Sequence, residues 1–120
     1  MRSPLAWLAI GALVLNLNSG ALAQAASNPN LNAQLLVAAR QGDLAALDRA
    51  LVRGAAPNSR NRLGKTALLI ACEKGLGAMA ERMLAAGADA NFASLEGVTP
   101  LMAASYGGHA ALAKRLLDAG

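Results

Sequence analysis

Apolar residues recur with helical spacing along most of this chain. Leu68, Ala71 and Cys72 lie three and four positions apart, and the run ends at Gly75. Side chains at this spacing share one face of a short helix, and glycine is favoured where a helix stops in a left-handed conformation. The same spacing recurs around Met83. The pattern therefore predicts short amphipathic helices separated by glycine turns.

This pattern repeats along the chain with a period of 33. Columns in register are Gly42, Gly75 and Gly108; Gly54, Gly87 and Gly120; Leu35, Leu68 and Leu101; Ala38, Ala71 and Ala104; and Leu51, Leu84 and Leu117. A fixed period of this length is the signature of a stacked repeat protein. The predicted units are residues 32–64, 65–97 and 98–120, the last one incomplete, with a linker over residues 24–31. We expect the sequence to be truncated at Gly120; the alternatives are that the last apolar stripe is partly exposed or that it meets a partner.

Each unit predicts a helix, a tight glycine turn, a second helix and an extended loop. Thr99 is placed to cap the first helix of the third unit, and Pro100 suits the first helical position. The loops, residues 58–65 and 91–98, carry a second turn at Gly64 or Gly97. The fold class is therefore all-α, a solenoid of about three helix-turn-helix units with connecting β-turn loops.

Stacking of the units is expected to supply the core, because no unit buries its apolar stripe alone. The small column Ala38, Ala71 and Ala104 implies close approach of the first helices. We expect Leu84 to be fully buried between units. The lone Cys72 lies on an apolar stripe, so we expect a buried and unreactive thiol.

Several motifs resemble the ankyrin repeat. Residues 99–104 (TPLMAA) resemble T-P-L-H-x-A, residues 87–91 (GADAN) resemble G-A-D-x-N, and Gly108-His109 resembles the G-H turn. The resemblance covers residues 32–120 and implies a non-enzymatic scaffold that binds another protein. Leu69 and Met102 depart from the histidine of the family pattern. The first unit lacks the T-P pair, which suits a terminal cap that faces water on one side.

Residues 1–23 follow a different pattern. Arg2 gives a positive start, residues 5–17 form an apolar run, and Ala23 completes a small-residue A-x-A site. This order is typical of a secretory signal peptide, and the run is shorter than the roughly 20 residues of a membrane span. We expect cleavage between Ala23 and Gln24, or two residues later after Ala25. The mature chain would be an exported, bacterial-type protein, periplasmic or secreted, without stable membrane insertion.

Candidate catalytic chemistry is nearly absent from the sequence. His109 is the one histidine, and no carboxylate pair or cysteine stands beside it at metal-ligand spacing. The G-x-S-x-G and G-x-x-x-x-G-K patterns do not occur. The resemblance gives His109 a structural place in the G-H turn. We therefore predict no enzyme activity, no cofactor and no metal site.

The formal net charge is +4, and residues 60–65 (RNRLGK) hold the densest charge cluster. With Arg40 and Lys74 this loop predicts a basic strip on the concave side, or else a solvated loop. Nucleic acid is not expected, because stacking aromatic residues are scarce. The expected partner is a protein, and the basic loop favours one with an acidic surface.

Register with the family assigns the partner-binding surface to the loop tips and the ends of the first helices. Those positions are Arg60, Arg62, Leu63, Lys65, Glu73, Lys74, Leu95, Glu96, Val98 and Tyr106. Leu63, Leu95 and Val98 would form a small apolar patch beside Tyr106, the best anchor candidate. The alternative functions are an accessory or inhibitory subunit of an exported enzyme, or the N-terminal part of a longer protein.

Overall fold

A computed structural model of the chain describes residues 29–120. Within that range the helices are α2 (Pro29–Gln41), α3 (Leu44–Val52), α4 (Ala67–Lys74), α5 (Gly77–Ala85), α6 (Pro100–Tyr106) and α7 (Ala110–Ala119). The described chain contains no strand, apart from one isolated bridge between Arg60 and Thr66. The predicted all-α class is confirmed for these residues. The predicted signal peptide, residues 1–23, lies outside them.

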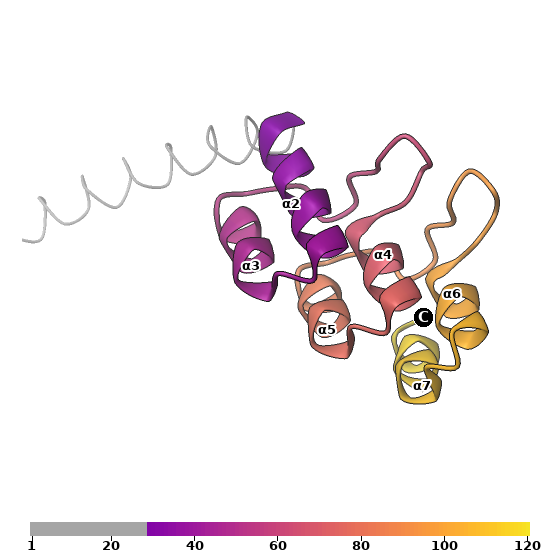
Figure 1. The fold of residues 1–120 in the computed structure, drawn as a ribbon. Coiled ribbons are helices and arrows are strands. Elements are labelled where there is room, and N and C mark those ends of the chain that lie inside the picture. Colours follow the sequence, from indigo (N-terminus) through magenta and orange to yellow (C-terminus); the bar gives the residue numbers. More distant parts are fainter. Residues whose placement is uncertain (1–28) are drawn as a thin grey trace, which may run out of the picture.

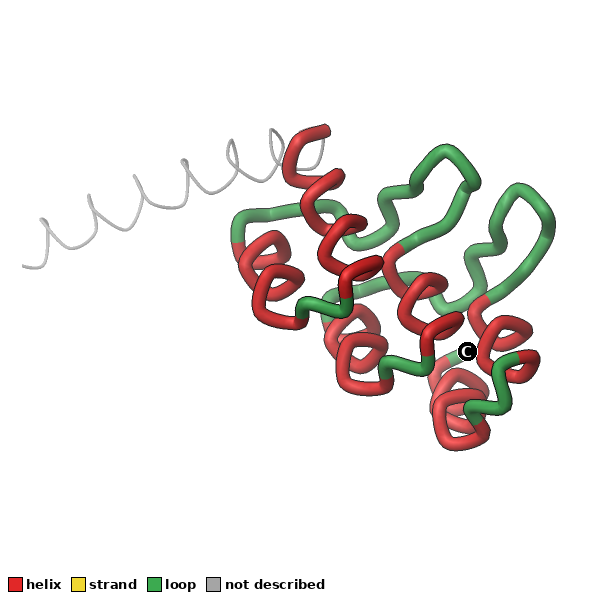
Figure 2. Tube along the Cα trace, in the orientation of Figure 1, coloured by secondary structure: helices red, strands yellow, loops and turns green. Residues whose placement is uncertain are grey.

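The helices form three pairs that stack side by side (Figure 1). Helices α2, α4 and α6 make an inner layer, and α3, α5 and α7 make an outer layer. Contacts join α2 to α4 and α4 to α6 across the inner layer, and α3 to α5 in the outer layer. Figure 2 shows the two long loops between pairs projecting on the side of the inner layer. Each packed pair therefore consists of one inner and one outer helix joined by a short turn.

The ends of the helices are set by local sequence. The Thr66 and Thr99 hydroxyl oxygens accept hydrogen bonds from the backbone N–H of Leu69 and Met102, each at 3.2 Å. These bonds satisfy amides that the first turn of a helix leaves unpaired. In the first unit, the Asp43 carboxylate caps α3 in the same way, at 3.0 Å from the Ala46 nitrogen. The predicted cap at Thr99 is thus confirmed.

Gly75 ends α4 in the left-handed region, with φ of 71°. A Cβ at this position would also lie only 2.4 Å from the His109 ring, because that ring packs into the turn from the next unit. Gly75 is therefore required for two reasons, its φ and the close approach of His109. The matching Gly42 has the same φ, but the nearest atom to its Cβ position is a Leu76 carbon at 3.6 Å.

The core runs without interruption through the three units. Ala38, Ala71 and Ala104 are all at most 1% exposed, which confirms close packing of the inner helices. The prediction for Leu84 was wrong, because Leu84 is only half-buried at the edge of the outer layer. Its neighbour Met83 is completely buried instead. One residue is about 100° of helical rotation, so the two side chains point in different directions.

Helix α2 is longer than its counterparts α4 and α6 and begins inside the predicted linker. Pro29 occupies the first turn, where proline costs no hydrogen bond. Leu31 packs against the core, and the Asn32 side chain accepts a hydrogen bond from the Ala56 nitrogen at 2.8 Å. These contacts attach the additional turn to the first unit, so residues 29–31 are helical. No helix among the described residues is long and apolar enough to cross a membrane.

Candidate protein-binding surface

Each long loop ends in a hairpin held by one polar side chain. The side-chain carbonyl oxygen of Asn61 accepts hydrogen bonds from the backbone nitrogens of Leu63 and Lys65, at 2.9 and 3.0 Å. The backbone N–H of Asn61 in turn donates to the Lys65 carbonyl at 3.0 Å. In the second loop Ser94 makes the equivalent bonds with Val98. The tips are therefore fixed by hydrogen bonds.

The two loops also contact each other. The Leu95 nitrogen donates to the Leu63 carbonyl at 3.0 Å, and the Asp89 nitrogen donates to the Asn58 side chain at 2.7 Å. The Arg60 guanidinium lies 4.5 Å from the centre of the Phe92 ring, within the range of a cation–π contact. These three contacts join the loops into one surface.

A hollow of about 490 Å³ opens between the first loop, the end of α2 and helix α4. It is lined by Arg40, Asn61, Arg62, Leu63, Lys65, Ile70, Glu73 and Lys74. Four of these side chains are cationic and one is anionic. The hollow brings together Arg40, Arg62, Lys65 and Lys74 of the predicted basic strip, but not Arg60, which stacks on Phe92.

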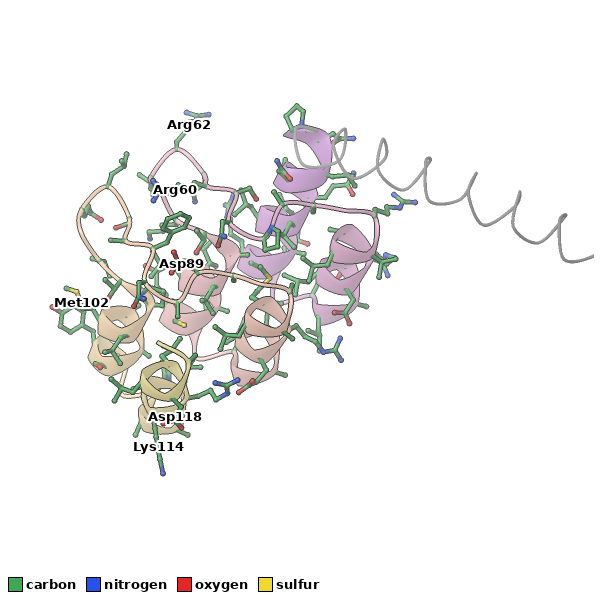
Figure 3. The ribbon with its side chains drawn as sticks, turned by 180° about the vertical axis from the view of Figure 1, so that it is seen from behind. Arg60, Arg62, Asp89, Met102, Lys114 and Asp118 are labelled. Atoms are coloured by element: carbon green, nitrogen blue, oxygen red, sulfur yellow. The ribbon has the colours of Figure 1, made fainter. Side chains whose placement is uncertain are left out.

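The ion pairing leaves the hollow positive. The Lys65 ammonium lies 2.8 Å from the Glu73 carboxylate, so these two charges offset each other. Arg40, Arg62 and Lys74 have no ion pair with any residue from 29 to 120. Figure 3 shows Arg62 at the tip of the first loop, pointing away from the helices. Three uncompensated cations around one hollow favour an acidic group as its occupant.

The structure divides the predicted binding residues into two groups. Arg62, Leu63, Lys65, Glu73 and Lys74 line the hollow. The others are Arg60, stacked on Phe92, and Leu95, Glu96, Val98 and Tyr106 of the second loop and third unit. Lys65 and Val98 are half-buried, since each directly precedes a helix cap, and Val98 packs against the core. Val98 is therefore not part of the exposed apolar patch that was predicted.

The exposed apolar positions of this surface are Leu63, Leu95 and Tyr106. Tyr106 at the end of α6 is 78% exposed, and Leu95 is 74% exposed. Folding does not account for these side chains. Sequence reasoning did not find the roles of Asn61 and Phe92. Asn61 stands three residues before Gly64, a spacing that is typical of a turn and could have indicated its role. Nothing in the sequence, in contrast, pairs Phe92 with Arg60.

His109 and Cys72, the single histidine and cysteine of the sequence, both pack against other parts of the fold. The His109 ring lies against the turns at Gly75 and Gly107. Cys72 is completely buried, and burial, with a smaller effect of the Glu73 charge, raises the pKa of its thiol to about 12. Among residues 29–120, no group of three or more His, Cys, Asp or Glu side chains is arranged to hold a metal ion.

Stacked helix pairs with projecting loops define a repeat solenoid, a class in which each unit contacts its neighbours and the stack offers an extended surface. Residues 35–120 match the family model described as "Ankyrin repeats (3 copies)", and the chain belongs to this family. Ankyrin repeats generally mediate protein–protein interactions and are typically non-enzymatic scaffolds. No curated protein matches the chain.

Proposed function

We propose that this chain is a non-enzymatic scaffold that holds a protein partner on the surface formed by the hollow, the two loop tips and Tyr106. The observation that carries the proposal is the group of uncompensated cations, Arg40, Arg62 and Lys74, around one hollow. Exposed Leu63 also lines this hollow, and its carbonyl accepts a hydrogen bond from the nitrogen of Leu95, which is exposed as well.

The partner is proposed to present an acidic surface. Positive potential in a concave site speeds the approach of an acidic protein and opposes the binding of basic ones. The exposed Leu63, Leu95 and Tyr106 would then supply the apolar contacts that hold the complex together. Tyrosine suits this role because it buries a large area with few rotatable bonds.

The test has two steps. The immobilised wild-type chain first captures proteins from cell-envelope extracts, and the affinity of each captured protein is then measured for the wild type and for the variants. Arg62→Glu is expected to slow association and to weaken its dependence on salt. Tyr106→Ala is expected to speed dissociation and to weaken binding about 30-fold or more, the usual effect at an interface hot spot. A partner is assigned to this surface only if both variants weaken its binding.

Arg53→Glu is the matched control for charge, because Arg53 is exposed and lies away from the hollow, at the end of α3. Thermal unfolding should show that all variants remain folded. Full binding by both Arg62→Glu and Tyr106→Ala, with loss only in Arg53→Glu, would place the interface elsewhere.

The scaffold is further proposed to act in the periplasm or outside the cell. The support is the sequence pattern of residues 1–23, which lie outside the described structure. N-terminal sequencing of chain recovered from the cell envelope should give a start at Gln24, or at Ala26 if the second site is used. Recovery of cytoplasmic protein that begins at Met1 would contradict export.

A further inference from the structure

Among the described residues that line the hollow, Glu73 is the only acid, and it already holds one of the four cations there. Its carboxylate lies 2.8 Å from the Lys65 ammonium, and the side chains of Lys65 and Glu73 are 22% and 36% exposed. The pair is therefore partly accessible from solvent. In the free chain, Glu73 occupies a cation that is then not available to an acidic partner.

The ion pair runs along the whole of α4. Lys65 directly precedes the N-cap Thr66, whereas Glu73 lies in the last turn of the helix, eight residues after Lys65. Eight residues of α-helix rise about 12 Å, so the two long side chains have to extend toward each other to meet. Ile70 lies between them in the sequence and lines the same hollow. The pair therefore forms part of the α4 wall of the hollow.

Neither neighbouring unit has the residue types for this ion pair. The corresponding positions one repeat away are Asn32 and Arg40 in the first unit, and Val98 and Tyr106 in the third. Helices α2 and α6 nevertheless form, and both pack against α4. The repeat fold therefore does not require the Lys65–Glu73 pair.

The end of α4 is also an unfavourable place for an acid. The carbonyl groups at the C-terminus of a helix carry partial negative charge, which repels a carboxylate in the last turn and attracts a cation. Arg40 stands at the same position of the repeat, in the last turn of α2, where its charge has the favourable sign. Helix formation therefore does not account for Glu73, whose ion pair is with a cation of the hollow.

We propose that Glu73 is an internal competitor for the acidic partner. In the free chain its carboxylate occupies Lys65, and in the complex a carboxylate of an acidic segment of the partner takes that place. Binding then costs the Lys65–Glu73 ion pair and leaves Glu73 beside an occupant of the same charge. Glu73 thereby lowers the affinity of the hollow for acidic segments that reach Lys65. This role rests on the proposed function, because it concerns the same hollow.

The experiment measures the binding of an acetylated and amidated hexaglutamate peptide by isothermal titration calorimetry at low salt. Glu73→Gln removes the competing charge and keeps the shape of the side chain. It is expected to bind the peptide about three- to fivefold more tightly than the wild type, which is the upper range for a partly exposed ion pair. Lys65→Gln should bind more weakly than the wild type, because one cation of the hollow is lost.

Combining the two changes separates displacement from simple repulsion. If a carboxylate of the peptide takes the place of Glu73 on Lys65, then Glu73→Gln should bring little gain in a chain that already carries Lys65→Gln. An equal gain with and without Lys65→Gln would overturn the proposal, because Glu73 would then act only through its charge at a distance.

Glu81→Gln is the matched control. Glu81 is also a glutamate in an ion pair, with Arg115, but it lies on α5 and does not line the hollow. Its replacement changes the net charge by the same amount and should leave the affinity for the peptide unchanged. Weaker binding by Glu73→Gln would overturn the proposal, since the ion pair would then hold the hollow in its binding shape. Thermal unfolding should show that every variant remains folded.

The same titrations distinguish the competitor role from the proposed function. If the wild type binds the peptide, Arg62→Glu weakens this binding and Glu73→Gln has no effect, then the function stands and the competitor role is overturned. Absence of binding by the wild type and by Glu73→Gln alike would overturn both.

Discussion

Met83 and Leu84 are adjacent on α5 and differ in burial, so they test the packing at the scale of one residue. Met83 is completely buried, and its replacement by alanine is expected to cost about 2–5 kcal/mol through lost contacts and a residual cavity. Leu84 is half-buried, so Leu84→Ala should cost less. Urea unfolding of both variants measures the difference. A larger loss in Leu84→Ala would contradict the described rotation of α5.

Cys72 carries a prediction about pH. Its pKa is about 12 in the folded chain, against about 8.5 in an unfolded chain, so folding favours the protonated thiol. The resulting stabilisation is fully present below about pH 8.5 and is lost as the pH rises toward 12. The unfolding free energy of wild type should therefore fall more steeply above about pH 9 than that of Cys72→Ala. Equal slopes would show that the thiol does not contribute.

The same burial predicts slow chemistry at Cys72. A thiol reagent at neutral pH should label the native chain slowly, because the thiolate is scarce and access is blocked. Labelling in urea should be fast, since unfolding restores both the ordinary pKa and access. Equal rates in the two conditions would be incompatible with a buried side chain.

At the scale of the element, Gly42 and Gly75 form a matched pair. Both turns have φ of 71°, but only Gly75 lies against the His109 ring. Gly42→Ala should cost about 1–2 kcal/mol for the left-handed conformation alone. Gly75→Ala should cost more, because its Cβ would also displace the ring. Thermal denaturation of the two variants gives the comparison.

His109→Ala identifies the source of the difference between the two turns. In a chain that already carries His109→Ala, the additional cost of Gly75→Ala should fall to the value found for Gly42→Ala. If the cost of Gly75→Ala does not change when the ring is removed, then the close approach does not limit this turn. The stability of the turn would then depend on φ alone.

At the scale of the whole molecule, the units are joined by apolar packing, and the two ion pairs between outer helices, Asp48–Arg82 and Glu81–Arg115, add little to it. The paired side chains are between 36% and 51% exposed, and exposed ion pairs contribute about 0.2–1 kcal/mol each. Arg82→Gln should therefore lower the unfolding free energy by less than about 1 kcal/mol, far less than Met83→Ala one residue away.

A double-mutant cycle of Asp48→Asn with Arg82→Gln measures this coupling directly. The coupling should shrink further in high salt, because both side chains are accessible to ions. A coupling of several kcal/mol would mean that these ion pairs, and not the apolar interface, hold the outer helices together. Arg115→Gln, at the equivalent position of the third unit, should behave like Arg82→Gln.

The repeat, the helix caps and the glycine turns were all determined by the sequence itself, because each depends on a few neighbouring residues. Thr66 and Thr99 cap the helix that follows them, and Gly75 adopts the φ that only glycine tolerates well. The regular register of the repeat adds the stacking of units, since no unit buries its stripe alone. The basic residues around Arg40, Arg62 and Lys74 were likewise predictable as one strip.

Only the tertiary structure decided which side chains of neighbouring units meet. The packing angle between units buries Met83 and leaves Leu84 at the edge, and it places Arg60 on Phe92 and Asp48 on Arg82. Arg60 and Phe92 are one position closer in sequence than a full repeat, and Asp48 and Arg82 are one position further apart. The period alone therefore does not indicate these contacts. They depend on the small rotation of each unit against the next, a quantity set by the shapes of the whole packed surfaces and not by any short stretch of sequence.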